Sequence, residues 1–334
     1  MNYHFERNST MQIGGQAVIE GVMMRAPGMV ATAVRKPSGE IVVKKEPFRS
    51  LAEKHALFKL PILRGAAGLI EMLIIGIRTL NFSAEIAMAE EQYVTGKNGH
   101  GQLKKGKWDS LKLGLTLSLS VGAAIAIFFV TPLAATTWMF NIEQDPLAFN
   151  LTAGIIRIAL LLGYLLAISQ LRDVNRLFQY HGAEHKAVFT FEKGEQLEVS
   201  AAARQSRFHP RCGTSFLLIV MFAAILLFGL LDTLLIGWLG QIDIIIRLLT
   251  HLPLIPLVGG ISYEFIKVSA KHSDTVLGKI IVAPGLWLQR ITTKEPDPKQ
   301  MEVALVALKC ALGDEPGEKI PEGGMKELVV VSLN

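Results

Sequence analysis

The sequence is poor in charged residues for its length. Aspartate, glutamate, lysine and arginine make up 19% of its 334 residues, and hydrophobic residues make up 50%. Soluble domains carry about 25% charged residues, so this balance argues against a soluble globular protein. Such a composition favours an integral membrane protein.

The sequence also has few cysteines and a small net charge. The two cysteines, Cys212 and Cys310, lie far apart in the sequence, which argues against a disulfide framework. A net charge of +5, spread along the chain, gives no basis for a nucleic-acid partner and suits loops that face the anionic inner leaflet. The N-terminal stretch MNYHFERNSTMQIGG has no apolar core of the signal-peptide type, so we expect an internal helix to direct insertion.

Four segments are long and apolar enough to cross the ~30 Å hydrocarbon core of a bilayer. They cover residues 111–140, 151–171, 214–239 and 243–266. Lysine and arginine gather before the first segment, between the second and third, and after the fourth, whereas the connections NIEQDP and GQID contain neither residue. This pattern predicts a multi-pass protein of the cell membrane, in contact with the lipid bilayer, with both termini cytoplasmic.

The rest of the chain is expected to form smaller cytoplasmic and interfacial elements. Residues 11–50 contain two alternating apolar runs around the turn PSGE, which predict a cytoplasmic β-hairpin subdomain. Residues 57–92 predict an amphipathic helix, and an interfacial, a bundle-packed and a re-entrant position stay open. Residues 111–290 form the four-span membrane domain with a cytoplasmic loop at 172–213. Residues 291–334 form a cytoplasmic C-terminal helix and tail, in which ELVVVSLN is a candidate strand beside the hairpin.

The fold class that follows is a mainly α membrane protein. We expect a four-helix transmembrane bundle, amphipathic interfacial helices and a small cytoplasmic N-terminal subdomain that contains β-structure.

The stretch QYHGAEHKAVF, residues 179–189, carries the strongest chemical signal. On a helix, His181, Glu184 and His185 share one face. Two neutral imidazoles four residues apart can chelate zinc, and the glutamate can accept a proton from bound water, so Glu184 is the candidate catalytic residue. H-x-x-E-H is the inverzincin order. The alternative is a structural polar network without a metal.

A second stretch, RFHPRCGTSF, places two further metal-capable residues just before the third span. His209 and Cys212 would lie at the inner membrane edge, and Glu264 would lie near the inner end of the fourth span. Zinc held by His181, His185 and Cys212 is one ligand set, and the two histidines with Glu264 form another. The sequence leaves this choice open and keeps His209 as an additional candidate ligand.

Convergence of these stretches requires a bend in the chain. If the second span continued straight past Leu171, His181 would lie about 15 Å below the interface and far from Cys212, at 1.5 Å per residue. We therefore predict a bend after Arg172 that lays the following amphipathic helix along the membrane.

Two ionisable residues fall inside the predicted spans. Arg157 and Asp232 both lie toward the outer half of the membrane, and we expect them to form a structural ion pair. His251 and His272 are each expected to be a hydrogen-bonded core residue.

Five stretches resemble the YqhQ-like family of multi-pass bacterial membrane proteins: IGGQAVIEGVMMR, RGAAGLIEML, HGAEHKAV, HPRCGTSF and QRITTKEPD. The resemblance covers roughly residues 11–310. It implies a membrane protein of a family whose members are described as predicted metal-dependent enzymes. The residues that match the supporting motifs are His181, Glu184, His185, His209 and Cys212, and this chain keeps all five.

These observations leave three functional hypotheses. The first is a membrane-embedded zinc-dependent hydrolase with its site at the cytoplasmic interface, acting on a peptide or lipid-linked substrate. The second is a non-enzymatic accessory factor in membrane-protein biogenesis or assembly, with a membrane-protein or peptide partner; the distinctive IGGQAVIEGVMMR stretch favours it. The third, a transporter, is weaker because the sequence shows no inverted repeat.

Overall fold

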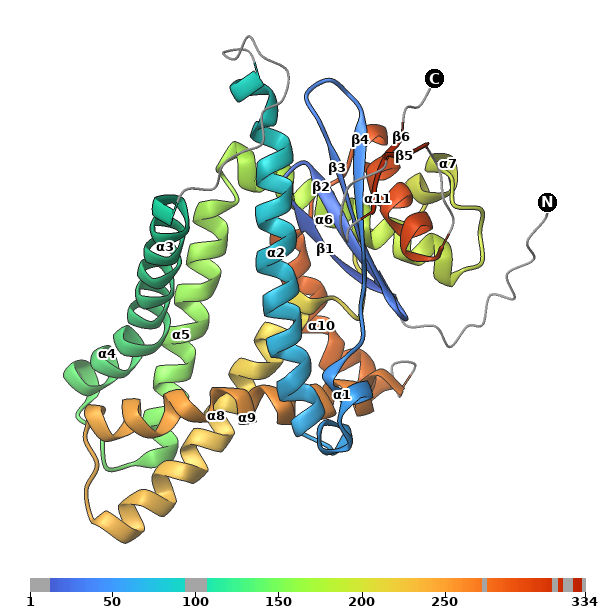
Figure 1. Cartoon of the computed structure of the whole chain (residues 1–334). Coiled ribbons are helices and arrows are strands. Elements are labelled where there is room, and N and C mark those ends of the chain that lie inside the picture. Colours follow the sequence, from blue (N-terminus) through green and yellow to red (C-terminus); the bar gives the residue numbers. More distant parts are fainter. Residues whose placement is uncertain (1–12, 94–106, 272–274, 314–317, 321–326, 332–334) are drawn as a thin grey trace.

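A computed structural model describes residues 13–93, 107–271, 275–313, 318–320 and 327–331 (Figure 1). Residues 11–12 of the predicted hairpin region and parts of the predicted C-terminal tail lie outside the described residues. The described chain combines a β-sheet, packed between helices, with a group of long apolar helices.

The sheet has six antiparallel strands and contains the predicted hairpin. In spatial order the strands are β1 (Gly14–Val18), β2 (Gly21–Ala26), β3 (Met29–Arg35), β4 (Ile41–Pro47), β6 (Glu327–Val331) and β5 (Glu318–Ile320). The turn PSGE joins β3 to β4, and Gly39 there has φ +96°, a conformation that glycine adopts without strain. The C-terminal strand β6 pairs with β4, as predicted for the tail. The N-terminal part is larger than one hairpin, because β1 and β2 extend it.

The two faces of the sheet bury different helices, as the period-2 alternation of a strand requires. The helices α6 (Arg172–Glu192) and α11 (Pro298–Ala311) cover one face, and α2 (Leu63–Tyr93) covers the other (Figure 1). The residues facing α6 and α11 include Val22, Met24, Ala31, Ala33, Ile41 and Val43, and those facing α2 include Val18, Met23, Val30 and Val34. The sheet thus fixes the position of α6, which carries the H-x-x-E-H motif.

Four helical segments are long and apolar enough to cross a membrane. The first, Gly114–Phe140, runs from α3 (Lys107–Ile125) through a π-helical turn into α4 (Thr131–Phe140). The second is α5 (Pro146–Ile168). The third and fourth are Phe216–Leu239 within α8 (Gly213–Leu239) and Ile244–Val268 within α9 (Ile244–Lys271). They agree with the four predicted spans and are compatible with a multi-pass membrane protein. Membrane insertion, the bundle arrangement and the cytoplasmic termini stay predictions.

Helix α2 packs along α9 before it reaches the sheet. A Cβ atom added to Gly65 would lie 3.0 Å from the Cα atom of Gly260, so the two backbones touch. Nearby, Arg64 Nε donates to Glu264 Oε1 over 2.6 Å. Helix α2 is therefore packed against α9, and its outer side is apolar, with Leu73 65% exposed. Its position relative to the membrane stays a prediction.

The predicted bend is present but begins earlier than expected. Helix α5 ends at Ile168 and α6 begins at Arg172. Leu171 between them has an extended backbone, with φ −72° and ψ 134°, and it serves as the N-cap of α6. The bend therefore precedes Arg172, because Arg172 and Asp173 already form the first turn of the new helix, where an acidic side chain complements the helix dipole.

Candidate metal centre

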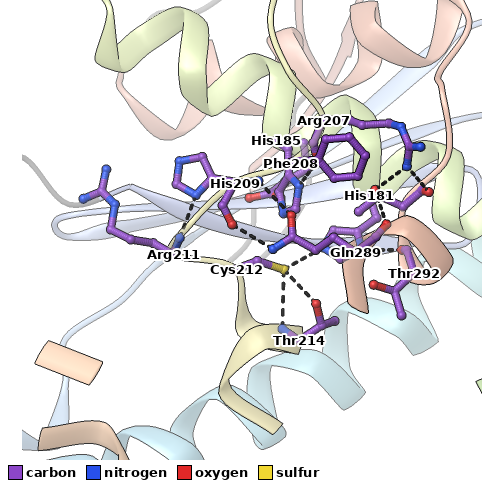
Figure 2. A network of polar contacts seen from close by, with 12 residues as sticks. His181, His185, Arg207, Phe208, His209, Arg211, Cys212, Thr214, Gln289 and Thr292 are labelled. Carbon is purple, nitrogen blue, oxygen red and sulfur yellow. Dashed lines mark hydrogen bonds and ion pairs between the residues drawn. The ribbon is translucent and has the colours of Figure 1, made fainter. Parts of the chain in front are cut away.

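Three metal-capable side chains converge where α6 passes the start of α8. His181 and His185 lie one turn apart on α6, and Cys212 immediately precedes α8. One ligand atom from each of the three lies within 4.8 Å of those of the other two (Figure 2). Within this group, His181 Nε2 and Cys212 Sγ lie 3.2 Å apart. Of the two predicted ligand sets, this is the one that the fold assembles.

Both histidines are oriented by main-chain carbonyl groups. His181 Nδ1 lies 2.8 Å from the carbonyl oxygen of Thr292, and His185 Nδ1 lies 2.5 Å from that of Arg207. A carbonyl oxygen only accepts, so each Nδ1 carries a hydrogen and each neutral ring keeps its lone pair on Nε2. This is the orientation that metal-binding histidines show, with the second nitrogen donating to a fixed acceptor.

The Nε2 atom of His185 has no hydrogen-bond partner among the described residues, although it is buried. A buried acceptor without a partner costs roughly 1–3 kcal/mol. Burial lowers the pKa of His185, which favours the neutral imidazole that can bind a metal. The ring is therefore prepared to accept a Lewis acid.

Cys212 lies in a polar environment rather than in an apolar core. It is the N-cap residue of α8, where its Sγ atom accepts from the Thr214 N–H over 3.4 Å and lies 3.1 Å from Thr214 Oγ1. The first turn of α8 therefore holds the sulfur in place beside the two histidines.

Glu184 lies beside the three ligand atoms. Its Oε2 atom is 3.5 Å from His185 Nε2, and its carboxylate accepts from the Gly15 N–H of β1. Burial raises the pKa of Glu184. No lysine or arginine in the described part of the chain pairs with this carboxylate. It can therefore take up or release a proton without breaking an ion pair.

The IGGQAVIEGVMMR stretch supports α6 at this point, a role that the sequence alone did not reveal. A Cβ atom on Gly15 would lie 2.5 Å from the Met23 carbonyl oxygen and 2.8 Å from Glu184 Cγ, so only glycine fits. Further along, the Glu20 carboxylate accepts from Arg176 Nη2 over 2.5 Å. The only sequence signals for these long-range contacts were the glycine pair and an isolated glutamate.

His209 lines the cluster but uses both ring nitrogens elsewhere. Its Nδ1 atom accepts from the Arg211 N–H over 3.2 Å, and its Nε2 atom lies 3.3 Å from Glu192 Oε2. Its ring centroid is 5.6 Å from that of His185. The structure thus places this additional candidate next to the three candidate ligands, with neither ring nitrogen free to join them.

Glu264 is not brought to the cluster. Its carboxylate is paired with Arg64 of α2, because close packing between Gly65 and Gly260 fixes α9 against that helix. The ligand set that included Glu264 is therefore not assembled.

Helix α10 (Val276–Thr292) holds the cluster from the other side, which the sequence analysis missed. Gln289 accepts from the His209 N–H over 2.7 Å and donates to the His209 carbonyl over 2.8 Å. Thr292 supplies the carbonyl that orients His181. The QRITTKEPD stretch begins with these residues, so the signal was present without an assigned role.

A second buried polar cluster corrects the predicted pairing of Arg157 with Asp232. Asp232 instead accepts from Arg247 Nε over 2.8 Å and from Asn150 Nδ2 over 2.7 Å, and lies 2.9 Å from His251 Nε2. Arg157 donates to the carbonyl oxygen of Phe128. The prediction failed because Arg247, at the start of α9, lies nearer in space to the acid. The prediction that His251 is a hydrogen-bonded core residue is confirmed. His272 lies outside the described residues.

Comparison with known proteins agrees with the motifs. Residues 60–314 match the family described as "Protein of unknown function (DUF1385)". "Uncharacterized protein YqhQ" of Bacillus subtilis (strain 168) is 35% identical over 298 residues, which cover 87% of this chain and 89% of that protein. No solved structure matches the chain. The chain therefore belongs to the DUF1385 family, which includes the YqhQ-like proteins that its motifs resemble.

Proposed function

We propose that this protein is a zinc-dependent hydrolase that works at the cytoplasmic surface of the cell membrane. The observation that carries the proposal is the convergence of two oriented imidazole lone pairs and one thiol within 4.8 Å of one another. A network that served only stability would not leave a buried acceptor such as His185 Nε2 without a donor.

The donor set fits zinc better than other common ions. Nitrogen and sulfur ligands suit this borderline-soft ion, whereas magnesium and calcium require oxygen ligands. Zinc held by two histidines and one cysteine supplies Lewis-acid chemistry and leaves one coordination position open. His181, His185 and Cys212 would hold the ion.

Glu184 is the residue that we propose to move the proton. Its carboxylate lies beside the ligand atoms, is buried, and accepts from the Gly15 N–H. Burial brings the pKa of a carboxyl group closer to neutrality, where a general base works best. Gly15 fixes the carboxylate, because its missing side chain lets the β1 backbone approach Glu184 closely.

The position of the cluster at the start of an apolar helix supports a substrate at the membrane surface. Cys212 directly precedes α8, so one ligand lies where a helix long enough to cross the bilayer begins. A peptide or a lipid-linked molecule at the cytoplasmic interface would therefore reach the site without leaving the membrane surface.

The experiment is a metal analysis of the full chain, purified in detergent. We expect about one zinc ion per chain, and we expect Cys212→Ser and His181→Ala to lose it. Cys310→Ser is the matched control, because Cys310 lies in the α11 core and should leave zinc in place. Glu184→Gln should keep zinc but lose the hydrolysis products that mass spectrometry detects when zinc-loaded protein is incubated with membrane lipids and peptides. A zinc-free protein whose His181→Ala variant behaves like wild type would contradict the proposal.

A second candidate function is an accessory factor in membrane-protein assembly. The exposed apolar side of α2 favours it, with Ile70 50%, Leu73 65% and Ile74 46% exposed. The IGGQAVIEGVMMR stretch no longer favours it, because Gly15 and Glu20 contact α6. Recovery of one stable protein partner, lost in Leu73→Glu and unchanged in Glu184→Gln, would support this function over hydrolysis.

A further inference from the structure

Two cationic side chains next to the metal centre share one exposed carboxylate. Lys186 follows His185 on α6 and is buried, with 4% exposure. Its Nζ atom lies 2.5 Å from Glu295 Oε1 and donates to the Ala203 carbonyl over 3.1 Å. Arg207 Nε lies 3.8 Å from the other oxygen, Glu295 Oε2. The Glu295 side chain itself is 67% exposed.

This cationic pair is linked to both histidine ligands. The Arg207 carbonyl accepts from His185 Nδ1, and its guanidinium donates to the carbonyl and hydroxyl oxygens of Thr293 over 2.5 and 2.8 Å. The preceding residue, Thr292, supplies the carbonyl that orients His181. Figure 2 shows Arg207 and His181 in the same network of polar contacts. A group bound by the pair would thus lie beside the residues whose carbonyl groups orient both histidines.

The charges of this group do not balance. Two cations face one carboxylate, and the longer of the two contacts, at 3.8 Å, is at the outer limit of an ion pair. A buried lysine requires a counter-charge, but an exposed glutamate on the linker between α10 and α11 can leave at little cost. A phosphate group offers more charge and more acceptor oxygens than a carboxylate, and arginine and lysine both bind it.

We propose that Lys186 and Arg207 bind a phosphate group of the substrate and that Glu295 occupies this place when no substrate is bound. The assignment of this phosphate to a substrate rests on the proposed hydrolase function. The proposal that phosphate binds here depends only on the two cations and not on the hydrolase function. The phosphate belongs either to a lipid headgroup or to a soluble molecule, and both present the same chemistry.

The test measures phosphate binding to the zinc-loaded full chain by calorimetry. One arm uses inorganic phosphate, and the other uses nanodiscs of phosphatidic acid against nanodiscs of phosphatidylcholine. Glu295→Gln should tighten binding roughly tenfold, because it removes the competing carboxylate, and Arg207→Gln should weaken it by a similar factor. Arg207→Gln keeps the main-chain carbonyl that orients His185. Lys186→Gln should also weaken phosphate binding, because it removes the second cation. If this variant does not fold, Lys186→Met gives the same test with an apolar side chain of similar length.

Arg204→Gln is the matched control, because Arg204 is an exposed arginine in the same segment and pairs with Glu195 instead. Unchanged affinity in Glu295→Gln, or equal weakening in Arg204→Gln, would overturn the inference. A preference for phosphatidic acid nanodiscs supports a lipid headgroup, whereas binding of inorganic phosphate alone supports a soluble substrate. Zinc content is recorded for each variant, so loss of zinc with intact phosphate binding would count against the hydrolase and not against this site.

Discussion

The described part of the chain contains two buried polar clusters with histidine, and they differ in how their polar atoms are paired. In the first, which joins α5, α8 and α9, Asp232 accepts from Arg247 and Asn150 and lies 2.9 Å from His251 Nε2. In the second, His181 Nε2 lies 3.2 Å from the Cys212 thiol, beside the unpartnered Nε2 of His185.

The difference separates a structural network from a candidate ligand site. The Asp232 cluster matches a carboxylate with a guanidinium. Arg247 Nη1 and His251 Nδ1 have no partner among the described residues, but the centre of this cluster is a charged acceptor with three polar contacts. The His181 cluster instead gathers two imidazole nitrogens and a thiol within 4.8 Å of one another, and one of these atoms, His185 Nε2, has no hydrogen-bond partner among the described residues. A bound ligand would explain a buried acceptor that has no donor.

The substitution with the largest expected effect disrupts the first cluster. Asp232→Ala leaves the fully buried Arg247 without its counter-charge, which should lower the free energy of unfolding by about 3–5 kcal/mol. Thermal unfolding in detergent measures the loss. Zinc per folded chain should not change, because the two clusters share no residue.

Asp243→Ala provides the control for this substitution. Asp243 lies at the start of α9 and accepts from the Ile246 N–H over 2.9 Å, so its removal should cost only about 1 kcal/mol, as for a helix cap. Equal losses in the two variants would show that Asp232 stabilises α9 no more than an end cap does.

A smaller effect sharpens the account of the second cluster. Gly15→Ala inserts a methyl group 2.8 Å from Glu184 Cγ, which should cost about 1–3 kcal/mol of unfolding free energy and shift the carboxylate. Zinc should stay bound, because none of the three ligands is changed, while hydrolysis falls. Gly14→Ala is the matched control, since a Cβ atom there meets nothing within 4 Å. Identical unfolding curves for the two variants would contradict the close approach of β1 to Glu184.

The sequence predicted those features that depend on local pattern. Hydropathy located the four apolar helices, the turn PSGE located the β3–β4 hairpin, and helical spacing placed His181, Glu184 and His185 on one face. The bend was predicted from the distance to Cys212, although its position depended on the capping of α6 at Leu171.

Features that depend on contacts between distant segments were beyond sequence reasoning. The partner of Asp232 depends on how α8 and α9 cross, and periodicity carries no information about that crossing. The sequence made Glu264 a candidate ligand, but the packing of Gly260 against Gly65 places its carboxylate beside Arg64 instead. The approach of Gly15 to Glu184 likewise joins a strand and a helix that lie far apart in the chain.

The most direct test of the central claim is X-ray absorption at the zinc edge of the purified full chain. The account predicts one sulfur ligand at about 2.3 Å and two imidazole nitrogens at about 2.0 Å, with the sulfur contribution lost in Cys212→Ser. A protein that contains no zinc, or zinc surrounded only by oxygen and nitrogen, would contradict it.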